Sequence, residues 1–241
     1  MAVITFANSK GGAGKTTAVL LLATELVRRN FRVCILDTDP QRWISRWFET
    51  AEKRANLSVE TFVSMATIQK TVTECQRNWD YVIIDLPGIQ SPLLATAIGL
   101  SDHVMIPVQG SSMDAQGGAQ VLDLLRYLDR KAGICIAHSV VLSRVNSFVT
   151  TRALQAVKHL LSEQRVHVLD TPIIERSAYR DMFDFHAYLH RMDPAKVSNL
   201  GKAIVNAERY ADEVLALVPL AQSTEDVLLA ARTLGRLEHA A

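Results

Sequence analysis

The sequence lacks any run approaching the ~20 consecutive apolar residues that a helix needs to cross a bilayer, so we expect no stable membrane association. Its first residues, Met-Ala-Val-Ile-Thr-Phe, contain neither a positively charged stretch nor a cleavage site, which predicts a cytoplasmic protein. Cysteine is scarce as well. The three cysteines show no CxxC spacing, which is typical of reduced cytosolic thiols.

An excess of charge of either sign is also absent, because 26 basic residues face 25 acidic ones and the formal net charge is +1. A protein that binds nucleic acid through bulk charge is far more basic, so any affinity for DNA must come from a local patch. Internal repeats, low-complexity runs and Gly/Ser linkers are missing too. This favours a single domain over residues 1–241, with residues 219–241 as a C-terminal helical tail.

Short apolar stretches alternate with longer helical ones, and this alternation predicts an α/β fold: a mostly parallel, twisted sheet with right-handed crossovers and helices on both faces. Strands are expected at residues 3–7, 32–36, 59–63, 81–84, 103–108 and 137–142, with shorter ones near 166–169 and 173–174. Helices are expected at about 14–29, 43–52, 67–78, 114–130, 150–163, 199–217 and 224–237, with Asp114 as an N-cap.

A glycine-rich segment stands between the first expected strand and the first expected helix. Its glycines, Gly11, Gly12 and Gly14, allow a tight turn whose N–H groups point inward at an anion, and the helix N-terminus adds partial positive charge there. The Lys15 ammonium can reach the β- and γ-phosphates of a nucleotide, and the Thr16 hydroxyl can ligate Mg²⁺. The segment therefore predicts a phosphate-binding loop.

The run Lys10-Gly-Gly-Ala-Gly-Lys-Thr-Thr17 resembles the deviant Walker A motif of the ParA/MinD ATPases, with Ser9 at the usual first glycine position and an extra lysine before the glycine pair. The resemblance implies the P-loop NTPase fold, with ATP and Mg²⁺ as cofactors. It assigns nucleotide contacts to Lys10, Gly11, Gly12, Ala13, Gly14, Lys15, Thr16 and Thr17. It also implies a homodimer on ATP, in which Lys10 reaches the phosphates of the partner subunit.

Two further segments carry acidic residues at the expected carboxyl ends of strands, where open parallel sheets bind ligands. The run Asp37-Thr-Asp39-Pro-Gln resembles a ParA signature in which the second aspartate, here Asp39, orients or activates the attacking water. Taken alone, this run could also be a helix cap followed by proline. The run Tyr81-Val-Ile-Ile-Asp85 resembles a Walker B strand, whose aspartate holds Mg²⁺ through water. The resemblance thus implies Lys10, Lys15 and Asp39 as catalytic residues and Thr16, Asp39 and Asp85 as the metal site.

Contacts to the base are implied at two later places. Ser143 and Arg144 stand where relatives place a pair of residues near the adenine. Glu175 and Arg176 stand where relatives read Pro-Arg, so glutamate replaces the family's proline. Because no clear Asn/Thr-Lys-x-Asp guanine reader is present, the sequence favours ATP over GTP.

The resemblance extends to about residue 218 and indicates the short ParA branch of plasmid partition, without an N-terminal operator-binding extension. It implies an ATPase that hydrolyses ATP slowly, dimerises on ATP, binds DNA non-specifically and associates with the nucleoid to segregate plasmids or chromosomes. The expected partner is a centromere-binding protein. The candidate DNA patch, expected on the late helices away from the P-loop, is Arg176, Arg180, Lys196, Lys202 and Arg209.

Two alternatives remain open. The run Asp-Pro-Gln-Arg-Trp-Ile-Ser-Arg-Trp47 is also similar to VirC-type proteins, which implies an adaptor ATPase that recruits a DNA-transfer complex. A MinD-like membrane-positioning ATPase is the third reading. The tail at 224–237 argues against it, since its two arginines are offset by Glu225 and Asp226.

Overall fold

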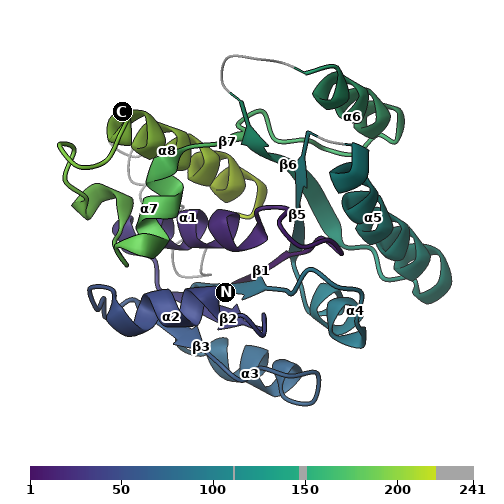
Figure 1. Ribbon diagram of the computed structural model, residues 1–241. Helices are drawn as coiled ribbons and strands as arrows, with labels where there is room; N and C mark the ends of the chain where they lie inside the picture. Colours follow the sequence, from purple (N-terminus) through teal and green to yellow (C-terminus); the bar gives the residue numbers. More distant parts are fainter. Residues whose placement is uncertain (111, 147–150, 221–241) are drawn as a thin grey trace, which may run out of the picture.

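The structure, a computed structural model, describes residues 1–110, 112–146 and 151–220. Its centre is a seven-stranded sheet in the order β3–β2–β4–β1–β5–β6–β7, and every neighbouring pair is parallel (Figure 1). The strands are β1 (Ala2–Phe6), β2 (Val33–Asp37), β3 (Leu57–Glu60), β4 (Tyr81–Asp85), β5 (His103–Gln109), β6 (Ala137–Val145) and β7 (Ile173–Ile174). The predicted fold class is confirmed.

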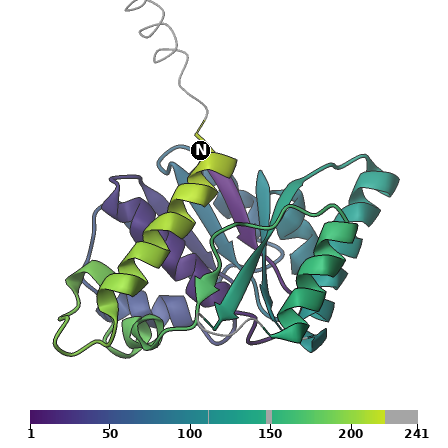
Figure 2. The ribbon, with the colours of Figure 1, turned by 90° about the horizontal axis from the view of Figure 1, so that it is seen from above.

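Helices cover both faces of the sheet, as Figure 2 shows for α1 and α8 on one side and α5 and α6 on the other. The first face carries α1 (Lys15–Arg28), α2 (Trp43–Thr50), α7 (Ser177–Asp184), the short 3₁₀ helix η1 (Leu189–Arg191) and α8 (Leu200–Leu217). The second face carries α3 (Ile68–Cys75), α4 (Pro92–Gly99), α5 (Ser112–Ala132) and α6 (Arg152–Glu163).

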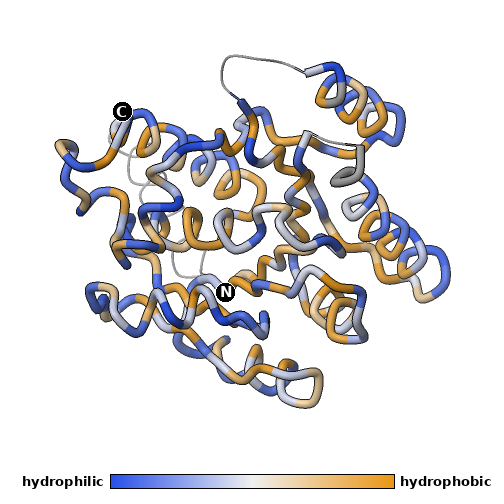
Figure 3. The backbone as a smooth tube through the Cα atoms, viewed as in Figure 1, coloured by the Kyte–Doolittle hydropathy of each residue, from blue (hydrophilic) through white to orange (hydrophobic). Residues whose placement is uncertain are grey.

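Burial on both faces follows from the strand sequences, which are apolar at nearly every position rather than at alternate ones. In β4, Tyr81 and Ile83 pack toward α1 and α8, whereas Val82 and Ile84 pack toward the opposite helices. Figure 3 shows the same pattern: the central strands and α1 are largely apolar. Among the described residues, no helix is long and apolar enough to cross a membrane.

Several expected elements differ from the structure. The third strand spans Leu57–Glu60 rather than 59–63, and 166–169 contributes only an isolated bridge between Val168 and Val140. Helices α4 and α7 were not predicted. Helix α5 begins at Ser112, so Asp114 lies inside the helix and is not its N-cap. The expected helix at 224–237 lies outside the described residues.

The strand register brings the chemically important residues to one edge of the sheet. Asp37 of β2 and Phe6 of β1 both lie opposite Asp85 of β4. Ser143 of β6 lies opposite Gln109 of β5 and Ile173 of β7. The carboxyl ends of six strands therefore line the edge at which the glycine-rich loop leaves β1, as expected for a ligand site in an open parallel sheet.

Candidate nucleotide-binding site

The glycine-rich loop between β1 and α1 has the backbone that a phosphate cradle requires. Gly12 and Gly14 adopt positive φ values of 81° and 88°, which side chains with a Cβ rarely adopt. Lys15 is the first residue of α1, so free N–H groups of the helix N-terminus lie beside the loop. A Cβ on Gly88 would come within 2.5 Å of the Gly11 nitrogen, so the loop after β4 packs directly against the cradle.

Hydrogen bonds from other strands hold this loop in place. The buried Asn8 side chain donates to the Pro107 carbonyl at 2.7 Å and accepts from the Lys10 N–H at 2.9 Å. On the other side, Ser143 Oγ donates to the Ala13 carbonyl at 2.6 Å. The cradle is therefore fixed by β5 and β6 before any anion enters, which reduces the ordering cost of binding.

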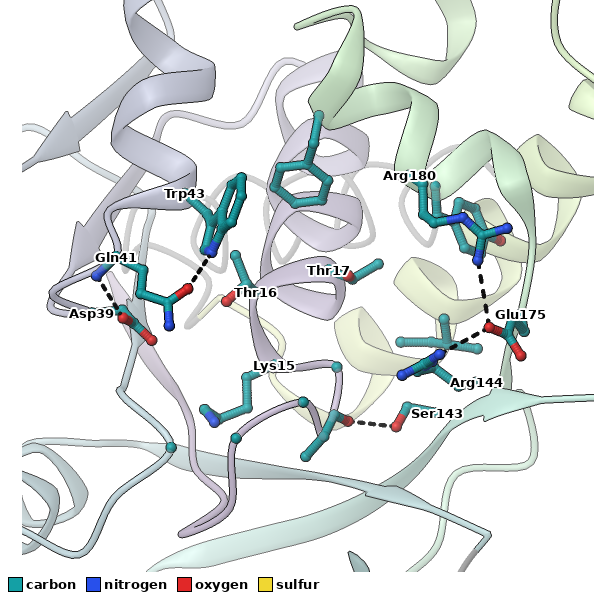
Figure 4. A pocket seen from close by; sticks show the side chains of 18 of the residues that line it. Lys15, Thr16, Thr17, Asp39, Gln41, Trp43, Ser143, Arg144, Glu175 and Arg180 are labelled. Carbon is teal, nitrogen blue, oxygen red and sulfur yellow. Dashed lines mark hydrogen bonds and ion pairs between the residues drawn. The ribbon is translucent and has the colours of Figure 1, made fainter.

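A cavity of about 770 Å³ opens above the loop (Figure 4). It is lined by Gly11, Gly12, Ala13, Gly14, Lys15, Thr16, Thr17, Asp39, Pro40, Gln41, Trp43, Pro87, Gly88, Ile89, Ser143, Arg144, Ile173, Ile174, Glu175, Arg176, Tyr179, Arg180, Phe183 and Asp184. All predicted cradle residues except Lys10 line it, together with Asp39 and the four residues predicted near the base. Asp85 lies buried beneath the lining.

Lys15 and Asp85 form the electrostatic centre of the site. Lys15 is 5% exposed, and its Nζ donates to the Lys10 carbonyl at 3.2 Å. Burial lowers the pKa of Lys15, against the opposing effect of Asp85 and Asp39. Burial raises the pKa of Asp85 to about 7, while the Thr16 hydroxyl and the Lys15 ammonium act in the opposite direction.

The two acids that end β2 have different surroundings. Asp37 is buried and accepts hydrogen bonds from the backbone and hydroxyl of Ser45 at 2.8 and 2.5 Å, so it anchors α2. Asp39 is partly exposed and lines the cavity, and its Oδ1 accepts a hydrogen bond from the Gln41 backbone N–H at 2.8 Å. Of the pair, Asp39 is therefore the carboxylate that can meet a ligand.

The residues predicted near the base gather at the opposite end of the cavity from Asp39 (Figure 4). Arg144, which has a positive φ of 51°, forms an ion pair with Glu175 at 3.0 Å, and Arg180 approaches the same carboxylate at 3.5 Å. The Arg176 Nε is buried without a hydrogen-bond partner among the described residues. This end therefore presents apolar strand residues together with guanidinium groups.

The five cations predicted as a DNA patch do not form one surface away from the P-loop. Arg176 and Arg180 line the nucleotide cavity, so their predicted location was wrong, because α7 folds back over the site. Arg176 also lines a second hollow of about 500 Å³ with Lys202 and Arg209, between the segment before β7 and α8. Lys196 is exposed between η1 and α8 and lines neither cavity.

Sequence reasoning missed several residues of the cavity. Gln41 and Trp43 stand two and four residues after Asp39, and Tyr179 and Phe183 come from the unpredicted helix α7. Trp43, the first residue of α2, is 48% exposed. The sequence signal for it was its place at the start of a helix directly after the acidic turn.

The parallel sheet with its glycine-rich loop, lysine and buried strand-end aspartate defines a P-loop NTPase. The family described as VirC1 protein matches residues 1–225. The chain is also 36% identical over 211 residues to Protein ParA of Rhizobium radiobacter, covering 88% of this chain and 95% of that protein. The chain therefore belongs to the VirC1 family and is a ParA/VirC1-type ATPase, as the sequence predicted.

Other relatives agree with this placement. The chain is 28% identical over 188 residues to Protein virC1 of Rhizobium rhizogenes, covering 76% of this chain and 80% of that protein. A protein of Borrelia burgdorferi B31 described as a putative plasmid partition protein, solved bound to AMPPNP, superposes with a TM-score of 0.69 at 20% identity, covering 90% of this chain and 99% of that chain. This last likeness concerns the fold.

Proposed function

We propose that the chain binds ATP with Mg²⁺ in this cavity and hydrolyses it slowly as a switch that controls dimerisation and non-specific binding of DNA. The observation that carries the proposal is the convergence of Lys15, Thr16 and Asp39 on one cavity, with the buried Asp85 beneath it. The relative from Borrelia burgdorferi, which is bound to AMPPNP, supports an adenine nucleotide as the ligand.

The residues around Asp85 fit a magnesium ion. Both carboxylate oxygens are buried without a hydrogen-bond partner among the described residues, and an orphaned buried carboxylate is costly unless a cation or ordered water meets it. Asp85 would hold Mg²⁺ through water, and Thr16 would supply its hydroxyl. Asp39 lies close enough for its carboxylate to interact electrostatically with the Lys15 ammonium. The ion neutralises charge on the β- and γ-phosphates when bound.

The chain's own groups account for the remaining chemistry. Backbone N–H groups of the loop and the Lys15 ammonium bind and orient the phosphates. Asp39 orients a water for in-line attack on the terminal phosphorus. The bond from phosphorus to the bridging oxygen breaks, ADP leaves with the electron pair, and the proton of the attacking water passes to the released phosphate. Ser143, Arg144, Glu175 and Arg176 surround the base.

In the proposed switch, two subunits join on ATP, with Lys10 reaching the partner's nucleotide. The dimer then presents two copies of its cations to DNA and remains on the nucleoid until hydrolysis separates it. A centromere-binding protein that triggers hydrolysis would convert this cycle into movement of a plasmid or chromosome.

Two variants test the nucleotide chemistry. Lys15→Ala is expected to lose most nucleotide affinity, because it removes the buried countercharge to the phosphates. Asp39→Ala is expected to bind ATP normally and to lose most hydrolysis, because it removes only the orientation of water. Titration with a fluorescent ATP analogue and measurement of phosphate release separate the two effects. Normal hydrolysis by Asp39→Ala would contradict the role given to that carboxylate.

A VirC-type adaptor is the second candidate, and the match to the VirC1 family over residues 1–225 favours it specifically. In that role, ATP binding recruits a DNA-transfer complex and hydrolysis is incidental. The two candidates differ in their partner: a centromere-binding protein should accelerate hydrolysis in the first, and a DNA-transfer complex should bind without accelerating it in the second. Steady-state ATPase assays with each partner distinguish them.

A further inference from the structure

The turn after β2 holds two side chains that the mechanism above does not use. Gln41 and Trp43 line the cavity beside Asp39, at the end toward which the Lys15 ammonium extends (Figure 4). The Lys15 ammonium at this end is a countercharge for an anion, so this end suits the charged terminal phosphate. Ser143, Arg144 and Glu175 lie at the opposite end.

Two hydrogen bonds tie this turn together. The Gln41 backbone N–H donates to Asp39 Oδ1 at 2.8 Å, which closes a local turn around the carboxylate. The Trp43 indole Nε1 donates to Gln41 Oε1, also at 2.8 Å. Asp39, Gln41 and Trp43 therefore form one connected chain, visible as two dashed lines in Figure 4.

The indole determines which way the carboxamide of Gln41 faces. An indole N–H can only donate, so it selects the amide oxygen and leaves the NH₂ group for another acceptor. Among the described residues, no side chain or carbonyl accepts a hydrogen bond from Gln41 Nε2. The group that remains is a donor in a cavity built for an anion.

Packing does not explain the indole at position 43. Trp47, one turn further along α2, is 1% exposed and belongs to the core, whereas Trp43 is 48% exposed at the rim of the cavity. The Arg46 guanidinium carbon stands over the Trp43 ring, 5.8 Å from its centroid. The polar contact to Gln41 is therefore the specific interaction that this side chain makes with the site.

We propose that Gln41 donates a hydrogen bond from Nε2 to the terminal phosphate of the bound nucleoside triphosphate, and that Trp43 is the positioning residue that orients it. The inference rests on the proposed function. It adds a neutral donor beside Asp39 at the place where charge is redistributed over the phosphate oxygens during water attack. A diphosphate does not extend to this donor, so the contact distinguishes ATP from ADP.

The first test compares Gln41→Ala with the wild type in binding and turnover. The variant is expected to bind a non-hydrolysable ATP analogue more weakly, to bind ADP with unchanged affinity, and to lose about 10- to 100-fold in kcat. Equal loss of affinity for ADP and the ATP analogue, or an unchanged kcat, would overturn the proposal. If the wild type itself neither binds nor hydrolyses ATP, the proposed function fails instead.

The second test examines whether Trp43 acts through Gln41. Trp43→Phe keeps an aromatic ring and removes the donor, so kcat should fall while ADP affinity stays constant. In the Gln41→Ala background the same change should have no further effect on kcat, because the residues act as one unit. Additive losses would refute the positioning role. Trp79→Phe, two residues before β4 and therefore beyond the end of that strand opposite Asp85, is the matched control and should leave kcat unchanged.

Tryptophan fluorescence supplies a signal that would not respond to the nucleotide if Trp43 had a purely structural role. The difference spectrum between wild type and Trp43→Phe isolates the Trp43 signal, which should change with the ATP analogue and not with ADP. In Gln41→Ala the change on adding the analogue should disappear. A Trp43 signal that responds equally to both nucleotides would contradict the link to the terminal phosphate.

Discussion

At the scale of single residues, Asp85 and Asp37 show how burial gives two similar carboxylates different roles. The two lie opposite each other in the register of β2 and β4, and both are almost fully buried. Asp37 is satisfied by Ser45, whereas both oxygens of Asp85 are without hydrogen-bond partners among the described residues. Asp85 thus stores an electrostatic penalty that a bound cation can relieve.

The raised pKa of Asp85 leads to a prediction about stability and pH. The pKa of this carboxyl is about 7 in the folded chain and near 3.8 when unfolded. The folded state therefore holds the proton more tightly, and its contribution to stability, complete below about pH 4, is lost as the pH rises through 7. Without nucleotide and Mg²⁺, Asp85→Asn should be more stable than the wild type above pH 7, and the difference should shrink toward pH 5.

Thermal unfolding measured from pH 5 to 8 tests this prediction. Adding ATP and Mg²⁺ at pH 8 should raise the Tm of the wild type more than that of Asp85→Asn. Asp123→Asn, at a carboxylate on α5 that is 73% exposed, is the control for removing one negative charge. Parallel Tm curves for the wild type and Asp85→Asn would show that the buried carboxyl does not titrate in this range.

At the scale of elements, the two tryptophans of α2 have different roles. Trp47 packs in the core on the sheet face that carries α1 and α8, whereas Trp43 lines the nucleotide cavity. Trp47 packs edge-on against Tyr188, with ring centroids 5.1 Å apart, and is 1% exposed. Trp47→Ala should therefore cost about 3–5 kcal/mol of unfolding free energy. Trp43→Ala, on the same helix and 48% exposed before substitution, should cost less than about 1 kcal/mol.

Urea unfolding of the two variants measures both values. The pair also checks that variants at position 43 fold, which the kinetic test of Gln41 requires. A loss at position 43 as large as that at position 47 would place Trp43 in the core in solution and remove the argument from its exposure.

The elements that were predictable share strong local signals. The five-residue apolar strands β1, β2 and β4 could be located within one or two residues, because each is buried on both faces; β2 and β4 also end at an aspartate. Helix α4 was missed because it has only eight residues and these are mostly apolar, so its sequence shows no helical period. The third strand was predicted two residues too late in the sequence, because only one of its four residues, Leu57, is buried.

The site was predictable only where a motif is contiguous in sequence. The glycine-rich loop, Asp39 and Asp85 each belong to a motif that is continuous in the sequence. A parallel sheet places the carboxyl ends of its strands along one edge, so we could expect these motifs to meet there. The position of Arg176 and Arg180 depends on how α7 folds over the cavity, which no local pattern encodes. The orientation of Gln41 likewise depends on a contact between side chains that appears only in three dimensions.

At the scale of the whole molecule, Lys10 raises the question of assembly. It is the one residue of the predicted cradle run that does not line the cavity of its own subunit, although its carbonyl accepts from Lys15. If Lys10 serves a partner's nucleotide, Asp39→Ala should sediment as a dimer with ATP and Mg²⁺, and adding Lys10→Ala should return it to a monomer. Lys70→Ala, on the exposed side of α3, is the control and should leave the dimer intact.

Sedimentation velocity at saturating ATP decides this prediction. A fluorescent-analogue titration of the Lys10→Ala monomer must show that it still binds nucleotide, because loss of binding would also prevent assembly. An Asp39→Ala protein that remains monomeric with saturating ATP and Mg²⁺ would rule out the proposed sandwich dimer.

The surface charge of the whole chain limits how it can hold DNA. With a net charge of +1, a monomer can offer only local cations, such as Lys202 and Arg209, which line the second hollow beside α8 and do not line the nucleotide cavity. A few phosphate contacts give weak affinity, whereas a dimer joins two such groups in one geometry. DNA binding should therefore rise steeply with ATP.

The salt dependence of DNA binding tests the assignment of individual cations. For each tenfold rise in salt concentration, the logarithm of the binding constant should fall by about 0.9 per phosphate contacted. Random duplexes should compete equally with any chosen site. Lys202→Ala and Arg209→Ala should each flatten the salt slope of the dimer, by about one unit for every phosphate that the wild-type side chain neutralises. Arg180→Ala should leave the slope unchanged, because Arg180 faces the nucleotide cavity and pairs with Glu175. Filter binding across a salt series, with ATP and with ADP, measures these slopes. Equal binding of DNA in the two nucleotide states would rule out the switch. No binding of DNA in either state would favour the adaptor.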